Sequence, residues 1–168
     1  LKGGRSLERE ISLRAGGNAE AALRRLGHDV LAVDVDQHLV RALRTERPDA
    51  AFIALHGKGG EDGTIQELLE ILEVPYTGSG PLACGLTTHK SLTKALLAGL
   101  GLPTPRGVMI DRERPFVSLP PTPELRYPLI VKPAFEDASV GIDEASVVEK
   151  AHRQPRFVDA MAEASPKL

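Results

Sequence analysis

The stretch GGRSLEREISL (residues 3–13) decides how this chain begins to fold. Two glycines lead into a serine and a cluster of acidic and basic residues. Because glycine has no Cβ, it allows a sharp turn or a close approach between the backbone and another group. The stretch therefore predicts a turn that runs directly into a helix, either beside a ligand or as an ordinary tight connection.

An amphipathic helix is predicted after this turn, over residues 8–26. Its apolar residues recur at helical spacing, and Gly27 follows where a left-handed C-terminal cap is expected. The apolar face consists of Ile11, Ala15, Ala19, Ala22, Leu23 and Leu26.

Strands and helices alternate beyond this helix. Residues 30–35 and 50–55 are short apolar runs that suit buried parallel strands, and residues 74–76 are a third extended piece. Helices are predicted between these runs, and the second begins with a Thr64–Glu67 capping box. The alternation predicts an α/β fold, an open and mainly parallel sheet with flanking helices.

Two glycine-rich segments are expected at one edge of this sheet. Ligands of such sheets usually bind beyond the carboxyl ends of the strands. The turn at residues 3–10 and the loop HGKGGEDG (56–63) both lie at such ends if their strands are parallel. The loop lacks the Gly-Lys-Ser/Thr ending of a P-loop, so it is either a flexible connection or a segment that lines a substrate.

A second domain is predicted after the proline-rich stretch LGLPTPRG (100–107). The predicted domains are residues 1–103 and 104–168. Within the second, YPLIVKPAFEDASVGIDEASVV (127–148) is expected to form a β-hairpin that carries Lys132 on its first arm.

The composition excludes several classes of protein. The chain has 168 residues, a formal net charge of −2, no tryptophan and one cysteine. Without a dense basic run or a stacking platform, it is not expected to bind nucleic acid. Its apolar runs are far shorter than the about 20 residues that span a bilayer, and a single cysteine fits a reducing compartment. A cytoplasmic protein that binds no membrane is therefore expected.

Three residues have both a structural and a functional interpretation. Glu8 at the helix start would either stabilise the helix dipole or bind an ammonium group. Candidate counter-charges are Arg5, Arg9 and Arg14. His56 would be either an ordinary loop residue or a substrate contact. Lys132, between an apolar strand and a proline, would be either an exposed edge lysine or a cation that meets an anion in a cleft.

Four segments together resemble the D-alanine–D-alanine ligase family of ATP-grasp enzymes. They are GGRSLEREISL (3–13), ALHGKGGEDGTIQELLEILEVPYTGSGPLA (54–83), HKSLTKALLAGLGLPTP (89–105) and LIVKPAFEDASVGI (129–142). The resemblance implies that residues 1–103 are the domain that precedes the ATP-grasp domain, and that residues 104–168 are a partial α+β ATP-grasp domain.

The resemblance implies an ADP-forming ligase that makes a peptidoglycan precursor for the cell wall. The carboxylate of one D-alanine would be activated by the γ-phosphate of ATP, and the amine of a second D-alanine would attack the acylphosphate. Glu8 would hold the ammonium of the first D-alanine, and His56 would line the second-substrate region. The residues that would bind ATP are Lys90, Lys132, Glu136, Ser139 and Gly141, of which Ser139 is also a catalytic candidate beside Glu8. The family resemblance also implies a homodimer.

Two features depart from the family pattern. Asp137 and Ala138 replace a glycine and the first of two serines, which leaves open a ligase for another amino acid or hydroxy acid. No residue after Val148 matches the family's ligands for Mg²⁺ or its arginine for the acylphosphate. The chain alone is therefore expected to be incomplete and inactive, with no metal ligand assigned. A non-catalytic ligand-binding module is the remaining alternative.

Overall fold

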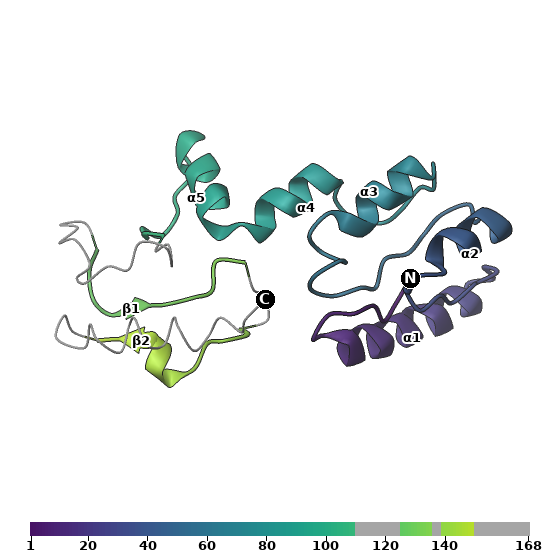
Figure 1. Cartoon of the computed structure of the whole chain (residues 1–168), viewed down its shortest axis with the longest axis horizontal. Helices are drawn as coiled ribbons and strands as arrows, with labels where there is room; N and C mark the ends of the chain where they lie inside the picture. The colour runs from purple at the N-terminus through teal and green to yellow at the C-terminus, as the bar shows by residue number, and fades with distance from the viewer. Residues whose placement is uncertain (110–124, 136–138, 150–168) are drawn as a thin grey trace. The chain divides into compact units, whose positions relative to one another are not determined.

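The structure is a computed structural model that describes residues 1–109, 125–135 and 139–149. Its contacts divide the chain into two compact units, Leu1–Thr88 and His89–Leu168. Figure 1 shows the helices and strands of both units. The predicted domain boundary after residue 103 falls inside the second unit and stays a prediction.

Short extended segments of the first unit pair in parallel. The parallel bridges are Lys2–Asp34 and Ala51–Tyr76. Leu1 bonds to two residues of segment 51–54. Its amino group donates to the Phe52 carbonyl at 2.7 Å, and its carbonyl accepts the Ala54 N–H at 2.9 Å. In a parallel pair, one residue bonds to the residues just before and just after the residue opposite it. Segments 1–2 and 51–54 are therefore parallel. The order of the segments is therefore 33–35, 1–2, 51–54 and 75–77, and they run in parallel. They are joined by isolated bridges, and the open parallel sheet expected from the sequence stays a prediction.

Four helices accompany these segments. They are α1 (Arg9–Arg25), α2 (Leu39–Glu46), α3 (Thr64–Ile71) and α4 (Pro81–Thr88). α1 ends as predicted, because Gly27 has a φ of +88° and its N–H donates to the Arg24 carbonyl at 3.0 Å. The His28 N–H donates to the Leu23 carbonyl at 3.2 Å, which completes a Schellman motif.

The buried face of α1 differs from the predicted apolar face. Ser12 and Gly16 are its buried residues, whereas Ile11 is 44% exposed and Leu26 is 74% exposed. The reason is a close contact between the backbone of α1 and the Lys2 side chain, since a Cβ on Gly16 would lie 2.5 Å from Cβ of Lys2. Small residues therefore make this contact, and the larger apolar side chains at the two ends of the predicted face stay in contact with solvent.

The predicted Thr64–Glu67 capping box is wrong. Gly63 is the N-cap of α3, and Thr64 is the first helical residue. The Asp62 carboxylate instead accepts hydrogen bonds from the Thr64 N–H at 3.0 Å and from the Gly59 N–H at 2.8 Å. Asp62 therefore joins the glycine-rich loop to the start of α3.

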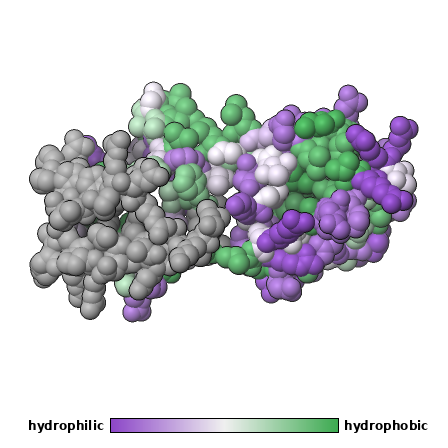
Figure 2. Space-filling model, in the orientation of Figure 1, coloured by the Kyte–Doolittle hydropathy of each residue, from purple (hydrophilic) through white to green (hydrophobic). Residues whose placement is uncertain are grey.

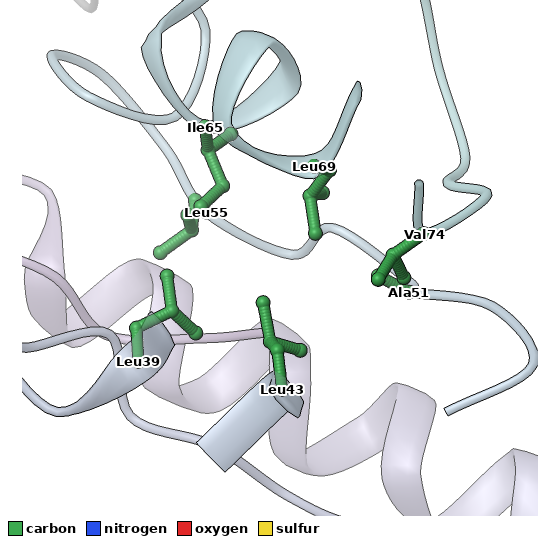
Figure 3. Close-up of a cluster of buried hydrophobic side chains, with 7 residues drawn as sticks. All are labelled: Leu39, Leu43, Ala51, Leu55, Ile65, Leu69 and Val74. Atoms are coloured by element: carbon green, nitrogen blue, oxygen red, sulfur yellow. The ribbon is translucent and has the colours of Figure 1, made fainter. Parts of the chain in front are cut away.

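A hydrophobic core links α2, α3 and the segment that contains Ala51 and Leu55 (Figure 3). It consists of Leu39, Leu43, Ala51, Leu55, Ile65, Leu69 and Val74. Leu69 is completely buried, and burial of a leucine side chain contributes about 1.5–3 kcal/mol. Figure 2 shows that the surface of this unit mixes hydrophilic and hydrophobic residues, and Leu82 of α4 is 85% exposed.

The second unit contains α5 (Lys90–Gly99), β1 (Leu129–Ile130), the short 3₁₀ helix η1 (Glu144–Ser146) and β2 (Val147–Val148). β1 and β2 pair antiparallel, with Leu129 opposite Val148. This pairing agrees with the predicted antiparallel arms, but Lys132 lies two residues after β1 rather than within it. None of the helices in the described ranges combines the length and the apolar character needed to cross a membrane.

Candidate functional site

The glycine turn before α1 and the HGKGG loop meet in the first unit. The Ser6 hydroxyl donates to the His56 carbonyl at 2.7 Å, although the two residues are 50 positions apart. The same hydroxyl oxygen accepts the Glu8 N–H at 3.1 Å. These bonds confirm the prediction that the two segments lie at the same edge of the parallel segments.

The Glu8 carboxylate points to the loop. Glu8 is the N-cap residue of α1, but its side chain makes no capping hydrogen bond. A Cβ on Gly57 would lie only 2.6 Å from Oε2 of Glu8. The carboxylate therefore lies against the loop backbone rather than over the first N–H groups of its own helix.

Two glycines of the loop are required by this geometry. Gly57 has a φ of +67°, and a side chain there would also meet Cβ and Oγ of Ser6 at 3.2 Å. A Cβ on Gly60 would lie 2.4 Å from Cβ of Leu55. The Gly60 N–H donates to the Gly57 carbonyl at 3.0 Å, so the loop closes into a tight turn beside Glu8.

His56 contributes both its backbone and its ring to this edge. Its carbonyl accepts the Ser6 hydroxyl, as described above. Its ring nitrogen Nδ1 lies 3.5 Å from Oε1 of Glu61, and about a third of its side chain is exposed. The structure thus brings the two predicted substrate residues, Glu8 and His56, to the same place through Ser6.

Arg9, one of the three candidate counter-charges for Glu8, is paired with a different acid. Arg9 donates to Oδ1 of Asp34 at 2.7 Å and to the Gly4 carbonyl at 3.0 Å. Its hydrogen bond to Asp34 holds the pKa of that carboxyl below its usual value. Arg9 therefore fixes the glycine turn to segment 33–35, and as a counter-charge it belongs to Asp34 rather than to Glu8.

Two buried polar residues of this region were missed in the sequence. Ser12 is fully buried, accepts the Gly3 N–H at 2.8 Å and donates to the Ala54 carbonyl at 2.7 Å. Gln66 is 5% exposed and donates to the Gly60 carbonyl at 2.7 Å. Their only sequence signal is a polar side chain on a helix face that is otherwise apolar or small.

The two predicted ATP lysines come from neighbouring segments of the second unit. Lys90 begins α5, and its N–H donates to the Ala134 carbonyl at 3.5 Å. The His89 and Phe135 rings meet edge to face, with centroids 4.6 Å apart. Lys132, two residues before Ala134, is exposed. The start of α5 therefore lies beside the segment that carries the second lysine.

Part of the predicted phosphate loop follows this segment. Ser139 and Gly141 both have left-handed backbones, with φ of 60° and 71°. The Ile142 N–H donates to the Ser139 carbonyl at 3.1 Å, which closes a compact turn. Glu136, with Asp137 and Ala138, lies outside the described residues.

The candidate residues thus fall into two groups. Glu8 and His56 belong to the first unit, whereas Lys90, Lys132, Ser139 and Gly141 belong to the second. Within the described ranges, no group of three or more His, Cys, Asp or Glu side chains is arranged to hold a metal ion.

Comparison with known proteins identifies a matching family and several similar proteins. The family described as D-ala D-ala ligase N-terminus matches residues 40–79. A D-alanine–D-alanine ligase from Pseudomonas entomophila is 49% identical over 142 residues, which is 84% of this chain and 44% of that protein. One from Halorhodospira halophila is 47% identical over 150 residues, which is 89% of this chain and 47% of that protein.

A solved structure gives the same result. The D-alanine–D-alanine ligase from Bacillus anthracis complexed with ATP has a TM-score of 0.80 and 28% sequence identity, over 96% of this chain and 53% of that chain. The chain spans less than half the length of the two curated relatives described above. These matches confirm the resemblance to the D-alanine–D-alanine ligase family that the sequence motifs indicate.

Proposed function

We propose that this chain, a relative of D-alanine–D-alanine ligases, is the amino-terminal part of an ATP-dependent ligase that joins two D-alanines. The observation that carries the proposal is the meeting of Glu8, Ser6 and His56 at one edge of the first unit. An anionic carboxylate against a tight glycine loop is suited to hold a small ammonium group. Relatives named D-alanine–D-alanine ligase, which match most of this chain, support the choice of substrate.

The reaction has two steps. A carboxylate oxygen of the first D-alanine attacks the γ-phosphorus of ATP, which forms an acylphosphate and releases ADP. The amine nitrogen of the second D-alanine then attacks the acyl carbon, phosphate leaves, and the nitrogen loses a proton as the peptide bond forms. In this scheme Glu8 holds the ammonium of the first D-alanine, and His56 lines the region for the second. Positioning and neutralisation of charge would supply most of the rate.

The second unit is assigned to ATP. Lys90 and Lys132 would neutralise phosphate charge, and the turn around Ser139 and Gly141 would offer backbone N–H groups to phosphate oxygens. Glu136 belongs to the same assignment by its place in the motif. Magnesium, when bound, would supply further neutralisation of phosphate charge, but no residue of this chain is assigned to it.

The domain bounds, the compartment, the oligomeric state and the partners of the protein are part of the same proposal. We assign residues 1–103 to the domain that precedes the ATP-grasp domain, an open parallel sheet with flanking helices, and residues 104–168 to part of the ATP-grasp domain. The protein would work in the cytoplasm, as a homodimer, on small molecules rather than nucleic acid or membranes.

A chimera tests the proposal. Residues 1–148 would be joined to the remaining carboxyl-terminal part of the Pseudomonas entomophila relative, and phosphate release would be measured with ATP, Mg²⁺ and D-alanine. We expect turnover by the chimera and none by the 168-residue chain alone. Glu8→Gln should lower kcat/KM by at least about tenfold, because it removes the charge that faces the ammonium.

Glu10→Gln is the matched control for this test. Glu10 is an exposed acid in the first turn of the same helix, so its loss removes the same charge from the helix start without touching the loop. A folded chimera that releases no phosphate, or equal losses in the two variants, would contradict the proposal. A panel of amino and hydroxy acids in the same assay tests the alternative raised by Asp137 and Ala138.

A further inference from the structure

We propose that Ser6 is a positioning residue that fixes Glu8 relative to His56, an inference that rests on the proposed amino-acid site. Within the described residues, Glu8 and His56 form no direct hydrogen bond with each other. The Ser6 hydroxyl joins them, because it bonds to the backbone of both. Ser6 would therefore set the affinity for the amino acid without contacting the reacting atoms.

The hydroxyl uses both of its hydrogen-bonding abilities here. It donates to the His56 carbonyl at 2.7 Å and accepts the Glu8 N–H at 3.1 Å. A serine hydroxyl has one donor and two acceptor positions, so a single hydroxyl can hold both groups at once. The bond from the Glu8 N–H to the Ser6 hydroxyl also closes a local turn, which places Glu8 at the N-cap of α1.

The surroundings leave Ser6 little freedom to move. Its own carbonyl accepts the Arg9 N–H at 3.2 Å, and the Ser12 N–H donates to the Glu8 carbonyl at 3.0 Å. On the other side, the Gly57 backbone lies so close that a Cβ there would meet Ser6 at 3.2 Å. The position of Glu8 is thus determined jointly by α1 and by the loop, and Ser6 is where the two meet.

The consequence concerns the geometry of binding. A carboxylate that binds an ammonium group loses much of its effect when it moves by about 1 Å, because charge-assisted hydrogen bonds depend on distance and angle. Without the Ser6 hydroxyl, the His56 carbonyl and the Glu8 N–H would both lose their partner. The segment before α1 would then shift relative to the loop, and Glu8 would no longer be held beside His56.

The experiment compares Ser6→Thr with Ser6→Val in the 168-residue chain. Both changes add a methyl group to the side chain, but only threonine keeps the hydroxyl. D-alanine affinity would be measured by NMR titration, and hydrogen exchange would be measured at the Glu8 amide. We expect Ser6→Thr to stay close to the wild type in both measurements. Ser6→Val should weaken D-alanine binding about tenfold and speed exchange at Glu8. Thr45→Val, an exposed change in α2, is the control and should alter neither.

The outcomes separate the inference from the proposed function. Equal D-alanine affinity in Ser6→Thr and Ser6→Val overturns the positioning role, while binding by the wild type would still support the proposed function. A wild-type chain that shows no response to D-alanine counts against the proposed amino-acid site, and the inference fails with it. Urea unfolding of each variant confirms that the compared chains are folded.

Discussion

Single residues at the edge of the first unit show why glycine is needed in the HGKGG loop. Gly57 and Gly59 both have positive φ, at +67° and +84°. Only Gly57 lies against other side chains, since a Cβ at Gly59 would meet nothing within 4 Å. A substitution at Gly59 therefore measures the cost of the left-handed backbone alone, whereas one at Gly57 adds the contact with Glu8.

Gly57→Ala is expected to destabilise the fold more than Gly59→Ala. A left-handed backbone costs an alanine about 1–2 kcal/mol at either position. At Gly57 the added Cβ would also meet Oε2 of Glu8 at 2.6 Å and Cβ of Ser6 at 3.2 Å, which should displace the carboxylate and weaken D-alanine binding. Urea unfolding and NMR titration measure the two effects. Similar stability and similar binding in both variants would show that Gly57 is not packed against Glu8.

The helices and turns show which features can be predicted from local sequence. The Schellman cap at Gly27 and the antiparallel pairing of β1 with β2 follow from glycine and strand patterns, and the structure contains both. These features depend on neighbours within a few residues. The association of Glu8 with His56 was expected because both motifs follow parallel segments.

Other features depend on contacts between distant residues and leave no local pattern. The bond from Ser6 to His56 spans 50 positions, and the bond from Ser12 to Ala54 spans 42. A close approach of α1 to Lys2 favours Gly16 over the larger apolar residues. The start of α3 was predicted wrongly for a different, local reason: Asp62, two residues before Thr64, supplies the carboxylate that accepts the Thr64 N–H, so Thr64 is the first helical residue and not the cap.

The start of α3 gives a prediction about pH. Burial raises the pKa of Asp62, but hydrogen bonds from Gly59 and Thr64 outweigh burial, and the pKa is lowered overall. A carboxyl with a lowered pKa contributes stability above its unfolded pKa of about 3.9 and loses that contribution as pH falls through the folded value. Asp62→Ala should therefore cost about 1 kcal/mol at pH 7, and the difference from wild type should shrink below about pH 4.

Urea unfolding across this pH range measures the effect of Asp62. Asp49→Ala is the control, because Asp49 is an exposed acid outside the loop, and its removal should change stability by less than about 0.5 kcal/mol. A difference between Asp62→Ala and wild type that stays constant from neutral to acid pH would contradict the assigned role of the carboxylate.

At the scale of the whole molecule, the first of the two units contains its own hydrophobic core. Every residue of the core cluster lies between Leu39 and Val74, within the first unit. The amino-acid candidates Glu8 and His56 are in this unit as well. A unit that contains its own core and both of these residues should fold, and bind D-alanine, without the rest of the chain.

Residues 1–88 are therefore expected to unfold cooperatively when expressed alone, and Leu69→Ala tests the role of the core in that fragment. Leu69 is fully buried, so its truncation should cost about 2–5 kcal/mol. Leu82→Ala makes the same chemical change at a residue that is 85% exposed, and it should stay within about 0.5 kcal/mol of the wild type. Urea unfolding followed by circular dichroism measures both variants. A fragment without a cooperative transition, or equal effects of the two substitutions, would mean that the first unit is not held together by this core, and the amino-acid site would then depend on residues beyond Thr88.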